Sequence, residues 1–335
     1  MYTANQIRHV HLEISTLCNA SCPWCPRTFW GYPYNGGYPE LNFTLANARY
    51  IFTPDFLTQL TGININGNFG DCVMNPETPD IVEYFKTHNN NLDIEINTNG
   101  GARSVDFWTR LAQAGAHILF ALDGLEDTHY LYRQNTLYDT VIKNAQSFIQ
   151  AGGKATWKMI EFDHNRHQID QCKHLSQQLG FADFKLVQSD RTVAPVFNSK
   201  GQLTHTLGNY TGEKEFAVLF HRKNTDTVLL EDIVANKKES SINCRVKQSK
   251  SVYISATGDV SPCCWTGLYP ATYGAGQYHE VANAQLNSII KRNNALEYSL
   301  EECINWFNEI EKTWSIDSFK QGRLIICNDV CGNTN

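Results

Sequence analysis

Seven of the eleven cysteines in this 335-residue chain fall into two groups, one near each end. The first group is Cys18, Cys22 and Cys25, three thiols within eight residues. An odd number of cysteines in a long chain without a secretion signal does not indicate a disulfide framework, and clustered thiols in a reducing compartment usually bind metal. The two groups are therefore candidate metal sites.

The spacing of the first group suits a cubane iron–sulfur cluster. Three thiolates in one loop can bind three of its four irons and leave the fourth iron open to a substrate or a cofactor. One alternative is structural zinc, which usually takes four ligands in two Cys-x2-Cys pairs. Another is buried structural cysteine, which the hydrophilic loop containing Pro23 and Pro26 disfavours.

The second group has the pattern Cys244-x13-Gly258-x4-Cys263, followed much later by Cys327-x3-Cys331. A hairpin with glycine in its turn brings the first two thiols together across adjacent strands, and the pair near the end of the chain can complete four ligands. A structural zinc site is the alternative, because four cysteines satisfy zinc equally well.

Cys264 follows Cys263 directly and has two possible roles. It could replace its neighbour as a metal ligand, or it could face a cavity as a thiol that donates a hydrogen atom. Neighbouring side chains on a strand point to opposite faces, so we do not expect both cysteines to bind one cluster.

The first half of the chain alternates between strand and helix patterns, which must position these residues. Short β-branched runs predict strands at residues 10–15, 62–66, 92–97, 118–122, 156–160 and 184–187. Between them, apolar residues recur at helical spacing over 107–111, 141–149 and 169–179, with Ser104 as the cap of the first of these helices. This α/β alternation predicts a parallel sheet with right-handed crossovers, curled into a partial (β/α)6 TIM-like barrel.

The pattern weakens after the sixth predicted strand, and a second module begins at the second cysteine group. We predict a barrel domain over residues 1–190, a connector over 191–243 and a small C-terminal domain over 244–335. The connector includes a turn-rich stretch at 198–202 and a polar stretch at 237–241. The C-terminal domain opens with a predicted β-hairpin over 251–260, turned at Gly258-Asp259, and continues with helical segments.

Composition excludes several classes of partner. The net charge is −6 and no basic block is present, which argues against a nucleic-acid partner. No apolar run approaches the roughly 18 residues of a membrane span, and no apolar secretory segment follows Met1. We therefore expect a cytoplasmic protein without a membrane partner.

The pattern Cys-x3-Cys-x-aromatic-Cys after the first strand, with Trp24 at the aromatic position, resembles the signature of the radical S-adenosylmethionine (SAM) superfamily. In that family the open iron of a [4Fe-4S] cluster binds the amino and carboxylate groups of SAM. One-electron reduction then cleaves SAM to a 5′-deoxyadenosyl radical. The resemblance also implies a low-potential electron donor such as a flavodoxin or ferredoxin.

Later loops are similar to further motifs of the same family. After the second strand, Gly70 and Asp71 stand where the family has Gly-Gly-Glu-Pro, which binds the SAM ammonium group. After the third strand, Thr98 and Asn99 are similar to a family Thr-Asn-Gly near the SAM ribose.

The loop after the fourth strand resembles a family Ser-x-Asp-Gly…His…Arg pattern. Asp123, His129 and Arg133 match it, and Ala121 replaces the family serine, so one expected hydrogen bond is missing. The resemblance implies that the arginine pairs with the SAM carboxylate, a contact that the planar guanidinium group makes well.

The second cysteine group resembles the auxiliary-cluster domain of SPASM and twitch radical SAM enzymes. The twitch form, with one auxiliary [4Fe-4S] cluster, fits better, because the spare cysteines do not match the spacing of a second cluster. The resemblance implies Cys244, Cys263, Cys327 and Cys331 as its ligands.

The expected function is that of a radical SAM enzyme that removes a substrate hydrogen and oxidises a peptide or protein side chain, or a sugar or aminocyclitol. An epimerase that uses Cys264 as hydrogen donor is one alternative, and a non-catalytic electron carrier is another. The first strand begins close to Met1, which leaves no room for a fused leader-peptide-binding domain and weakens the ribosomal-peptide alternative unless a separate recognition protein exists.

Four polar residues follow the fifth strand and could include a general base for a substrate proton: Glu161, Asp163, His164 and His167. Their alternative role is that of surface polar residues.

Overall fold

The computed structural model describes residues 1–33, 38–188, 194–208, 241–268 and 277–333. The chain divides into two compact units. The larger unit comprises Leu12–Asn35 and Pro39–Tyr210, and the smaller unit comprises Met1–His11, Gly36–Tyr38 and Thr211–Asn335. Each unit carries one of the two cysteine groups.

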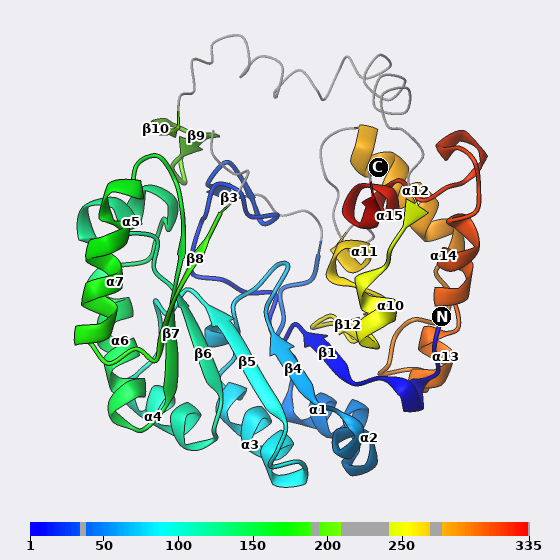
Figure 1. The fold of residues 1–335 in the computed structure, drawn as a ribbon, viewed down its shortest axis with the longest axis horizontal. Helices are drawn as coiled ribbons and strands as arrows, with labels where there is room; N and C mark the ends of the chain where they lie inside the picture. The colour runs from blue at the N-terminus through cyan, green and yellow to red at the C-terminus, as the bar shows by residue number, and fades with distance from the viewer. Residues whose placement is uncertain (34–37, 189–193, 209–240, 269–276, 334–335) are drawn as a thin grey trace. The chain divides into compact units, whose positions relative to one another are not determined.

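The larger unit is built on parallel strands in the order in which they occur in the sequence (Figure 1). These strands are β4 (Gly62–Ile65), β5 (Asp93–Thr98), β6 (His117–Ala121), β7 (Lys154–Ile160) and β8 (Asp183–Val187). Strand β1 (His9–Leu12) leads into this unit, where the Asn66 amide donates a hydrogen bond to the Leu12 carbonyl at 3.1 Å. All the strands predicted for the first half of the chain are thereby confirmed.

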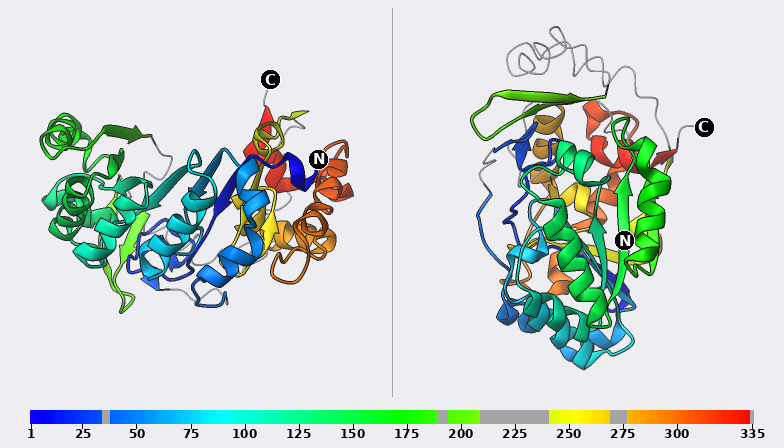
Figure 2. Two further views of the ribbon diagram at one scale, coloured as in Figure 1. Left: turned by 90° about the horizontal axis from the view of Figure 1, so that it is seen from below. Right: turned by 90° about the vertical axis from the view of Figure 1, so that its left-hand side faces the viewer.

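Helices connect consecutive strands and lie along one face of the sheet (Figures 1 and 2). They are α1 (Leu45–Ile51), α2 (Pro54–Gln59), α3 (Thr78–His88), α4 (Val105–Gln113), α5 (Glu126–Tyr132), α6 (Tyr138–Gln150) and α7 (Ile169–Gln178). As predicted, Ser104 caps α4, where its side chain accepts a hydrogen bond from the Phe107 amide. The predicted helices at α4, α6 and α7 are confirmed.

The two faces of this sheet differ in chemistry. Phe120 of β6 contacts Trp108 of α4 and Phe148 of α6, with ring centroids 5.2 and 6.0 Å apart, which identifies the helix-covered face. Side chains alternate along each strand, so Glu95 and Asn97 of β5 belong to the opposite face. We call that opposite face the inner face; its side chains are polar and half-buried on β5.

A β-hairpin lies within the stretch predicted as a connector. Strands β9 (Ala194–Phe197) and β10 (Leu203–Leu207) pair antiparallel, and the turn-rich residues 198–202 join them. The hairpin packs on the first cysteine loop, since the Phe197 amide donates to the Trp30 carbonyl at 2.8 Å. The polar stretch predicted at 237–241 lies outside the described residues, apart from Ser241.

The smaller unit contains the predicted hairpin of β12 (Ser251–Ile254) and β13 (Val260–Ser261), which pair antiparallel. Gly258 in its turn has φ +90°, a conformation that favours glycine. Strand β11 (Ser241–Ile242) pairs with β14 (Gly332–Asn333). The helices are α10 (Arg245–Ser249), α11 (Cys264–Leu268), α12 (Gln277–Ile289), α13 (Leu300–Ile304), α14 (Phe307–Thr313) and α15 (Ile325–Cys331).

Short elements complete the chain: the strands β2 (Thr28–Phe29) and β3 (Tyr32–Pro33), and the 3-10 helices η1 (Ala4–Gln6), η2 (Cys72–Met74), η3 (Arg166–Gln168) and η5 (Phe319–Gln321). Among the described helices, none has both the length and the apolar character required to cross a membrane.

Candidate active site and cluster-binding loops

The first cysteine loop follows β1 and packs against the core of the larger unit. Cys22 is buried in a hydrophobic cluster with Tyr132 and Phe162, and Cys18 and Cys25 pack against the same cluster. The Cys25 amide donates to the Cys22 carbonyl at 3.0 Å, which turns the loop back on itself. The three predicted thiols are therefore gathered in one partly buried loop.

Burial raises the pKa of the Cys18 thiol, and the nearby Asp71 carboxylate and the other two thiols of the loop add to this effect. The three sulfurs therefore lie within electrostatic reach of one another. Negative charge on such a cluster of thiolates needs compensation by hydrogen-bond donors or by bound metal.

Hydrogen-bond donors surround the sulfurs of this loop. Arg133 Nη1 lies 3.7 Å from Cys22 Sγ, and Asn99 Nδ2 lies 3.7 Å from Cys18 Sγ. The Ala20 amide lies 3.4 Å from Cys18 Sγ. Trp24 Nε1 is buried and has no hydrogen-bond partner among the described residues. An arginine, a side-chain amide and a backbone amide beside these thiols fit an iron–sulfur cluster, whose sulfurs accept hydrogen bonds.

Arg133 and Asp123 form a buried ion pair at the same site. Arg133 Nε donates to Asp123 Oδ2 at 2.6 Å, and Asp123 Oδ1 accepts from the Ile160 amide at 2.6 Å. The side chain of Asp123 is fully buried, and the guanidinium carbon of Arg133 lies 5.2 Å from the centre of the Tyr132 ring. The ion pair holds the guanidinium group beside Cys22.

His129 forms hydrogen bonds with the segments on either side of it, at Asp123 and Thr136. The Asp123 amide donates to its Nδ1 at 3.3 Å, and its Nε2 lies 3.0 Å from Thr136 Oγ1. Burial lowers the pKa of His129 to about 4, so the ring is neutral near pH 7. The structure thus brings together the predicted Asp123, His129 and Arg133.

Asp71 joins the loops that follow β4 and β5. Its carboxylate accepts hydrogen bonds from Thr98 Oγ1 at 2.7 Å, from the Asn99 amide at 2.7 Å and from the Val73 amide at 3.1 Å. Burial raises the pKa of Asp71, and these bonds oppose that increase. The structure therefore places Asp71, Thr98 and Asn99 together, with the carboxylate directed at their loop.

Gly70 is required by the close approach of two loops. A Cβ atom at this position would lie 1.7 Å from the Ser15 carbonyl oxygen, so any larger residue would displace the backbone. The predicted glycine lets the loop after β4 contact the segment that leads into the cysteine loop.

Glu13 is a site residue that the sequence analysis missed. Its side chain is 1% exposed, and Oε1 accepts hydrogen bonds from the amides of Phe69 and Gly70 at 2.7 and 2.9 Å. The available signal was an acidic residue between Leu12 and Ile14 in an otherwise apolar segment. A buried carboxylate normally has hydrogen-bond donors beside it, and here they belong to the loop after β4.

The polar residues that follow β7 differ in their environment. Glu161 and Asp163 both pair with Arg166, at 2.6 and 3.1 Å. The His164 ring stacks on Phe162 with centroids 5.1 Å apart, and both ring nitrogens are buried without a hydrogen-bond partner among the described residues. Burial lowers the pKa of His164 to about 4. His164 is therefore a neutral base beside the core of the cysteine loop.

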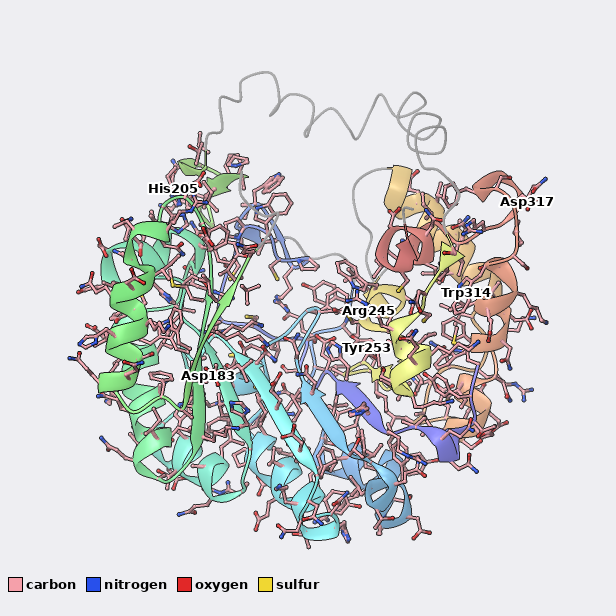
Figure 3. The ribbon with its side chains drawn as sticks, viewed as in Figure 1. Asp183, His205, Arg245, Tyr253, Trp314 and Asp317 are labelled. Carbon is pink, nitrogen blue, oxygen red and sulfur yellow. The ribbon has the colours of Figure 1, made fainter. Side chains whose placement is uncertain are left out.

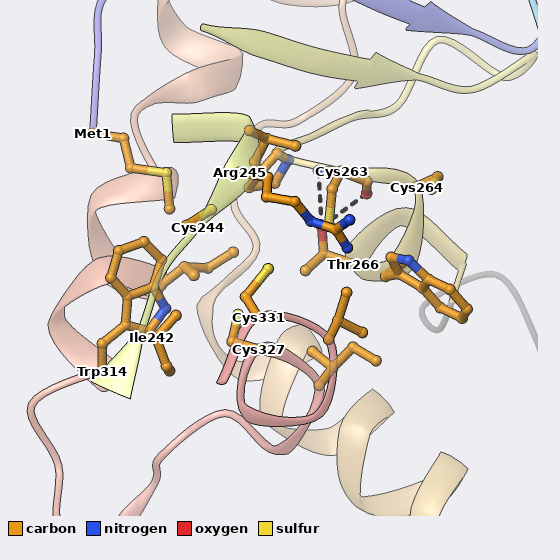
Figure 4. A pocket seen from close by; sticks show the side chains of 16 residues that line it. Met1, Ile242, Cys244, Arg245, Cys263, Cys264, Thr266, Trp314, Cys327 and Cys331 are labelled. Carbon is orange, nitrogen blue, oxygen red and sulfur yellow. Dashed lines mark hydrogen bonds between the residues drawn. The ribbon is translucent and has the colours of Figure 1, made fainter. Parts of the chain in front are cut away.

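In the smaller unit, the second cysteine group lines one pocket of about 190 Å³ (Figure 4). The pocket is lined by all four predicted ligands: Cys244, Cys263, Cys327 and Cys331. Arg245 and Trp314 lie beside them (Figures 3 and 4). Segments far apart in the sequence therefore bring their thiols to a single cavity.

Interactions among these thiols show how close they lie. Cys244 and Cys331 form a side-chain hydrogen bond, which lowers the pKa of Cys331, and the adjacent Arg245 lowers it further. Thr266 Oγ1 donates to the Cys263 carbonyl at 2.9 Å and lies 3.5 Å from Cys263 Sγ. The buried indole of Trp314 acts on the Cys327 thiol as a hydrogen-bond donor, which opposes the increase in the pKa of that thiol caused by burial. This cationic, donor-bearing environment fits an iron–sulfur cluster.

A single metal ion needs its ligands closer together than an iron–sulfur cluster does. Across the described ranges, no three or more His, Cys, Asp or Glu side chains gather closely enough to surround one metal ion.

The expected reason for separating Cys263 from Cys264 is wrong. Strand β13 ends at Ser261 and helix α11 begins at Cys264, so strand alternation does not apply to this pair. Both residues line the same pocket, with Cys264 at the first position of the helix (Figure 4). The role of Cys264 stays a prediction.

Comparisons with solved structures identify the fold. SuiB of Streptococcus suis, solved with S-adenosylmethionine bound, superposes with a TM-score of 0.55 at 15% identity, over 88% of this chain and 65% of SuiB. Native anSMEcpe with bound AdoMet gives 0.55 at 14% identity, over 91% of this chain and 84% of that protein. The chain has the radical SAM fold. This confirms the predicted α/β partial barrel.

The radical SAM fold is shared at low sequence identity. No family model matches the sequence, and no curated protein matches it. The chain spans about 65% of the length of SuiB.

Proposed function

We propose that this protein is a radical SAM enzyme that carries two [4Fe-4S] clusters and oxidises its substrate. The observation that carries the proposal is the assembly of the Cys18–Cys25 loop with Arg133 and Asn99 at its sulfurs, in the radical SAM fold. When bound, the first cluster supplies the electron that cleaves SAM to a 5′-deoxyadenosyl radical. Domains over 1–190 and 244–335, joined by 191–243, would house the two clusters.

The residues of the larger unit would bind and orient SAM. Arg133 keeps guanidinium N–H groups beyond its bond to Asp123 and can pair with a carboxylate. Asp71 fixes the loop that carries Thr98 and Asn99 through two hydrogen bonds, and these three side chains are buried away from water. Gly70 keeps the backbone close to the cysteine loop, and Trp24 can donate its free indole N–H. His164 can accept a proton from the substrate at a ring nitrogen.

The four cysteines of the smaller unit would hold the auxiliary cluster. They form a complete ligand set, so no iron is left open to substrate, and the group would serve there as an electron acceptor. This supports a net two-electron oxidation, with a flavodoxin or ferredoxin as the donor for the first cluster. Epimerisation with Cys264 as hydrogen donor is the second candidate, because Cys264 lines the same pocket.

The substrate class is proposed from two similar structures. SuiB has been solved with the precursor peptide SuiA, at a TM-score of 0.54, and anSMEcpe with the Cp18Cys peptide, at 0.53. These similarities support a peptide or protein side chain as the substrate. A sugar or an aminocyclitol is the alternative.

The test is SAM cleavage by anaerobically reconstituted protein. With dithionite and SAM, the wild-type protein should release 5′-deoxyadenosine, measured by liquid chromatography and mass spectrometry. Replacement of Cys18, Cys22 and Cys25 together by Ala should abolish it, whereas Cys172→Ala, on the far side of the sheet in α7, should not. Wild-type protein with full iron content and no 5′-deoxyadenosine would instead favour an electron carrier.

Once a substrate is identified, one experiment distinguishes oxidation from epimerisation. The Cys264→Ala variant is run in deuterated water and the product is weighed. A loss of two hydrogens that persists in the variant supports oxidation. A product of unchanged composition that gains one deuterium in the wild type, and does not form in the variant, supports epimerisation.

A further inference from the structure

Two lysines lie side by side on the inner face of the larger unit. Lys158 of β7 is the register partner of Lys185 of β8 in a parallel pair, so the two side chains point to the same face. Lys158 is half-buried and Lys185 is exposed. Like charges on directly opposed residues of neighbouring strands are destabilising, and a bound anion removes that cost.

Lys158 is held in place by a side chain two strands away. Its Nζ donates to Asn97 Oδ1 of β5 at 2.8 Å. Asn97 pairs with Leu119 of β6, whereas Lys158 pairs with Ala121 of β6, so the lysine side chain reaches diagonally across β6. One of the three donors of the ammonium group is used, and two remain.

The acidic residues nearby make no direct contact with the two lysines. Glu95 accepts a hydrogen bond from Asn64 Nδ2 at 2.8 Å, and Asp123 pairs with Arg133 at 2.6 Å. Asp183 shares the face of Lys185 but lies at the start of β8, further from the cysteine loop (Figure 3). Within the described residues, neither Lys158 nor Lys185 forms an ion pair with a carboxylate. The two ammonium groups are therefore not neutralised by a direct carboxylate contact, and Glu95 and Asp123 act on Lys158 only through space.

The lysine pair adjoins the proposed SAM site. The next inner-face residue after Lys158 is Ile160, about 6.6 Å along the strand. Ile160 belongs to the same hydrophobic cluster as Cys22. Arg133 and Asp123 both act electrostatically on Lys158. A ligand held by the two lysines would thus lie about two residues along β7 from the side chains that pack against the first cysteine loop.

We propose that Lys158 and Lys185 form a subsite that binds an anionic oxygen group of the substrate, a carboxylate or a phosphate. The proposal deepens the proposed function and rests on it in taking the bound group as part of the substrate. The two ammonium groups lie on neighbouring strands, and Asn97 fixes one of them. By binding the anionic group of the substrate, they would orient the substrate toward the proposed SAM site. Charge-assisted hydrogen bonds of this kind are the stronger ones in proteins.

Burial lowers the pKa of Lys158, and Arg133 and Lys185 lower it further. A larger fraction of its amine is then unprotonated near neutral pH and able to react with an aldehyde. This reactivity makes the subsite testable before the substrate is known.

The experiment labels lysines with pyridoxal phosphate, using pyridoxal, which lacks the phosphate, as the matched probe. Anaerobic holoenzyme loaded with SAM, without reductant, is treated with either aldehyde, fixed with borohydride and mapped by peptide mass spectrometry. Lys158 should be labelled about tenfold or more faster by the phosphate-bearing probe, the effect of one charge-assisted hydrogen bond. Lys154, exposed on the same face of β7, should show no such preference.

Variants and competitors decide the outcome. Lys185→Gln should remove most of the preference at Lys158 while leaving its amine in place, and Lys154→Gln should leave the preference unchanged. Protection by succinate but not by inorganic phosphate assigns a carboxylate, and the reverse assigns a phosphate. Equal labelling by both probes would overturn the subsite. A preference for the phosphate-bearing probe that appears only without SAM would also overturn it. In that case bound SAM would block the site, and the anion that the lysines bind would be the SAM carboxylate.

The proposed function is checked on the same preparation. Formation of 5′-deoxyadenosine after addition of dithionite reports SAM cleavage, which the control variant Lys154→Gln should leave intact. An enzyme that cleaves SAM but shows no phosphate-dependent labelling contradicts the subsite alone. A preparation that labels as expected but does not cleave SAM contradicts the proposed function alone.

Discussion

Arg133 combines three contacts in one side chain: an ion pair with Asp123, a donor to Cys22 Sγ and a stacking contact with Tyr132. Lysine would keep the charge but lose the planar fork. We expect Arg133→Lys to weaken SAM binding about ten- to a hundredfold, the value of a charge-assisted hydrogen bond. The dissociation constant is measured on the oxidised holoenzyme by calorimetry.

The matched control is Arg166→Lys, an exposed arginine paired with Glu161. It should leave the dissociation constant unchanged. An unchanged constant in Arg133→Lys would remove Arg133 from the SAM site.

His129 makes stability depend on pH. Burial lowers its pKa from 6.5 to about 4, so between these values the unfolded chain takes up a proton that the folded chain excludes. Stability should therefore fall as the pH falls from about 6.5 to about 4, by about 3 kcal/mol from this group. Above that window His129 contributes no pH dependence, and below it the loss is complete.

This pH dependence is measured by urea unfolding across the window. His129→Gln should make stability decline less steeply with falling pH than in the wild type. The control His174→Gln, at an exposed position of α7, should keep the wild-type slope. If His129→Gln also keeps it, the buried neutral ring is not the cause.

At the scale of elements, Glu13 ties the segment after β1 to the loop after β4. Glu13→Ala would leave the amides of Phe69 and Gly70 buried without their acceptor. We expect a loss of about 2–5 kcal/mol in the free energy of unfolding. Urea denaturation of the reconstituted protein measures it.

Glu13→Gln provides the matched control for this link. Its amide oxygen can accept the same two hydrogen bonds, so most of the stability should be retained. Equal losses in the Ala and Gln variants would mean that the negative charge, rather than the acceptor atom, holds the loop.

At the scale of the whole molecule, each compact unit carries its own set of cysteines. Anaerobically reconstituted protein should therefore hold about eight irons, two cubanes. Replacement of Cys244, Cys263, Cys327 and Cys331 together by Ala should leave about four irons and preserve SAM cleavage without substrate. Iron and sulfide analysis with electron paramagnetic resonance checks both numbers. Loss of all iron would contradict two independent ligand sets.

The sequence by itself determined the order of the elements and the composition of the cysteine loop. Cys18, Cys22 and Cys25 lie within eight residues, so their proximity is a property of the local chain. The strands β4 to β8 and the helices α4, α6 and α7 follow from apolar periodicity, which reports burial directly. The motifs at Gly70, Thr98 and Arg133 could be found because each follows its own predicted strand.

Only the tertiary structure decided which distant side chains meet. Glu13 reaches the amides of Phe69 and Gly70, and Lys158 of β7 reaches Asn97 of β5 across β6, through strand register that no local pattern encodes. The sequence analysis also treated Cys264 as part of a strand, whereas the structure begins a helix at this residue. Local periodicity fixes which face of an element is buried, whereas contacts between elements depend on register and packing, which are set by the whole chain.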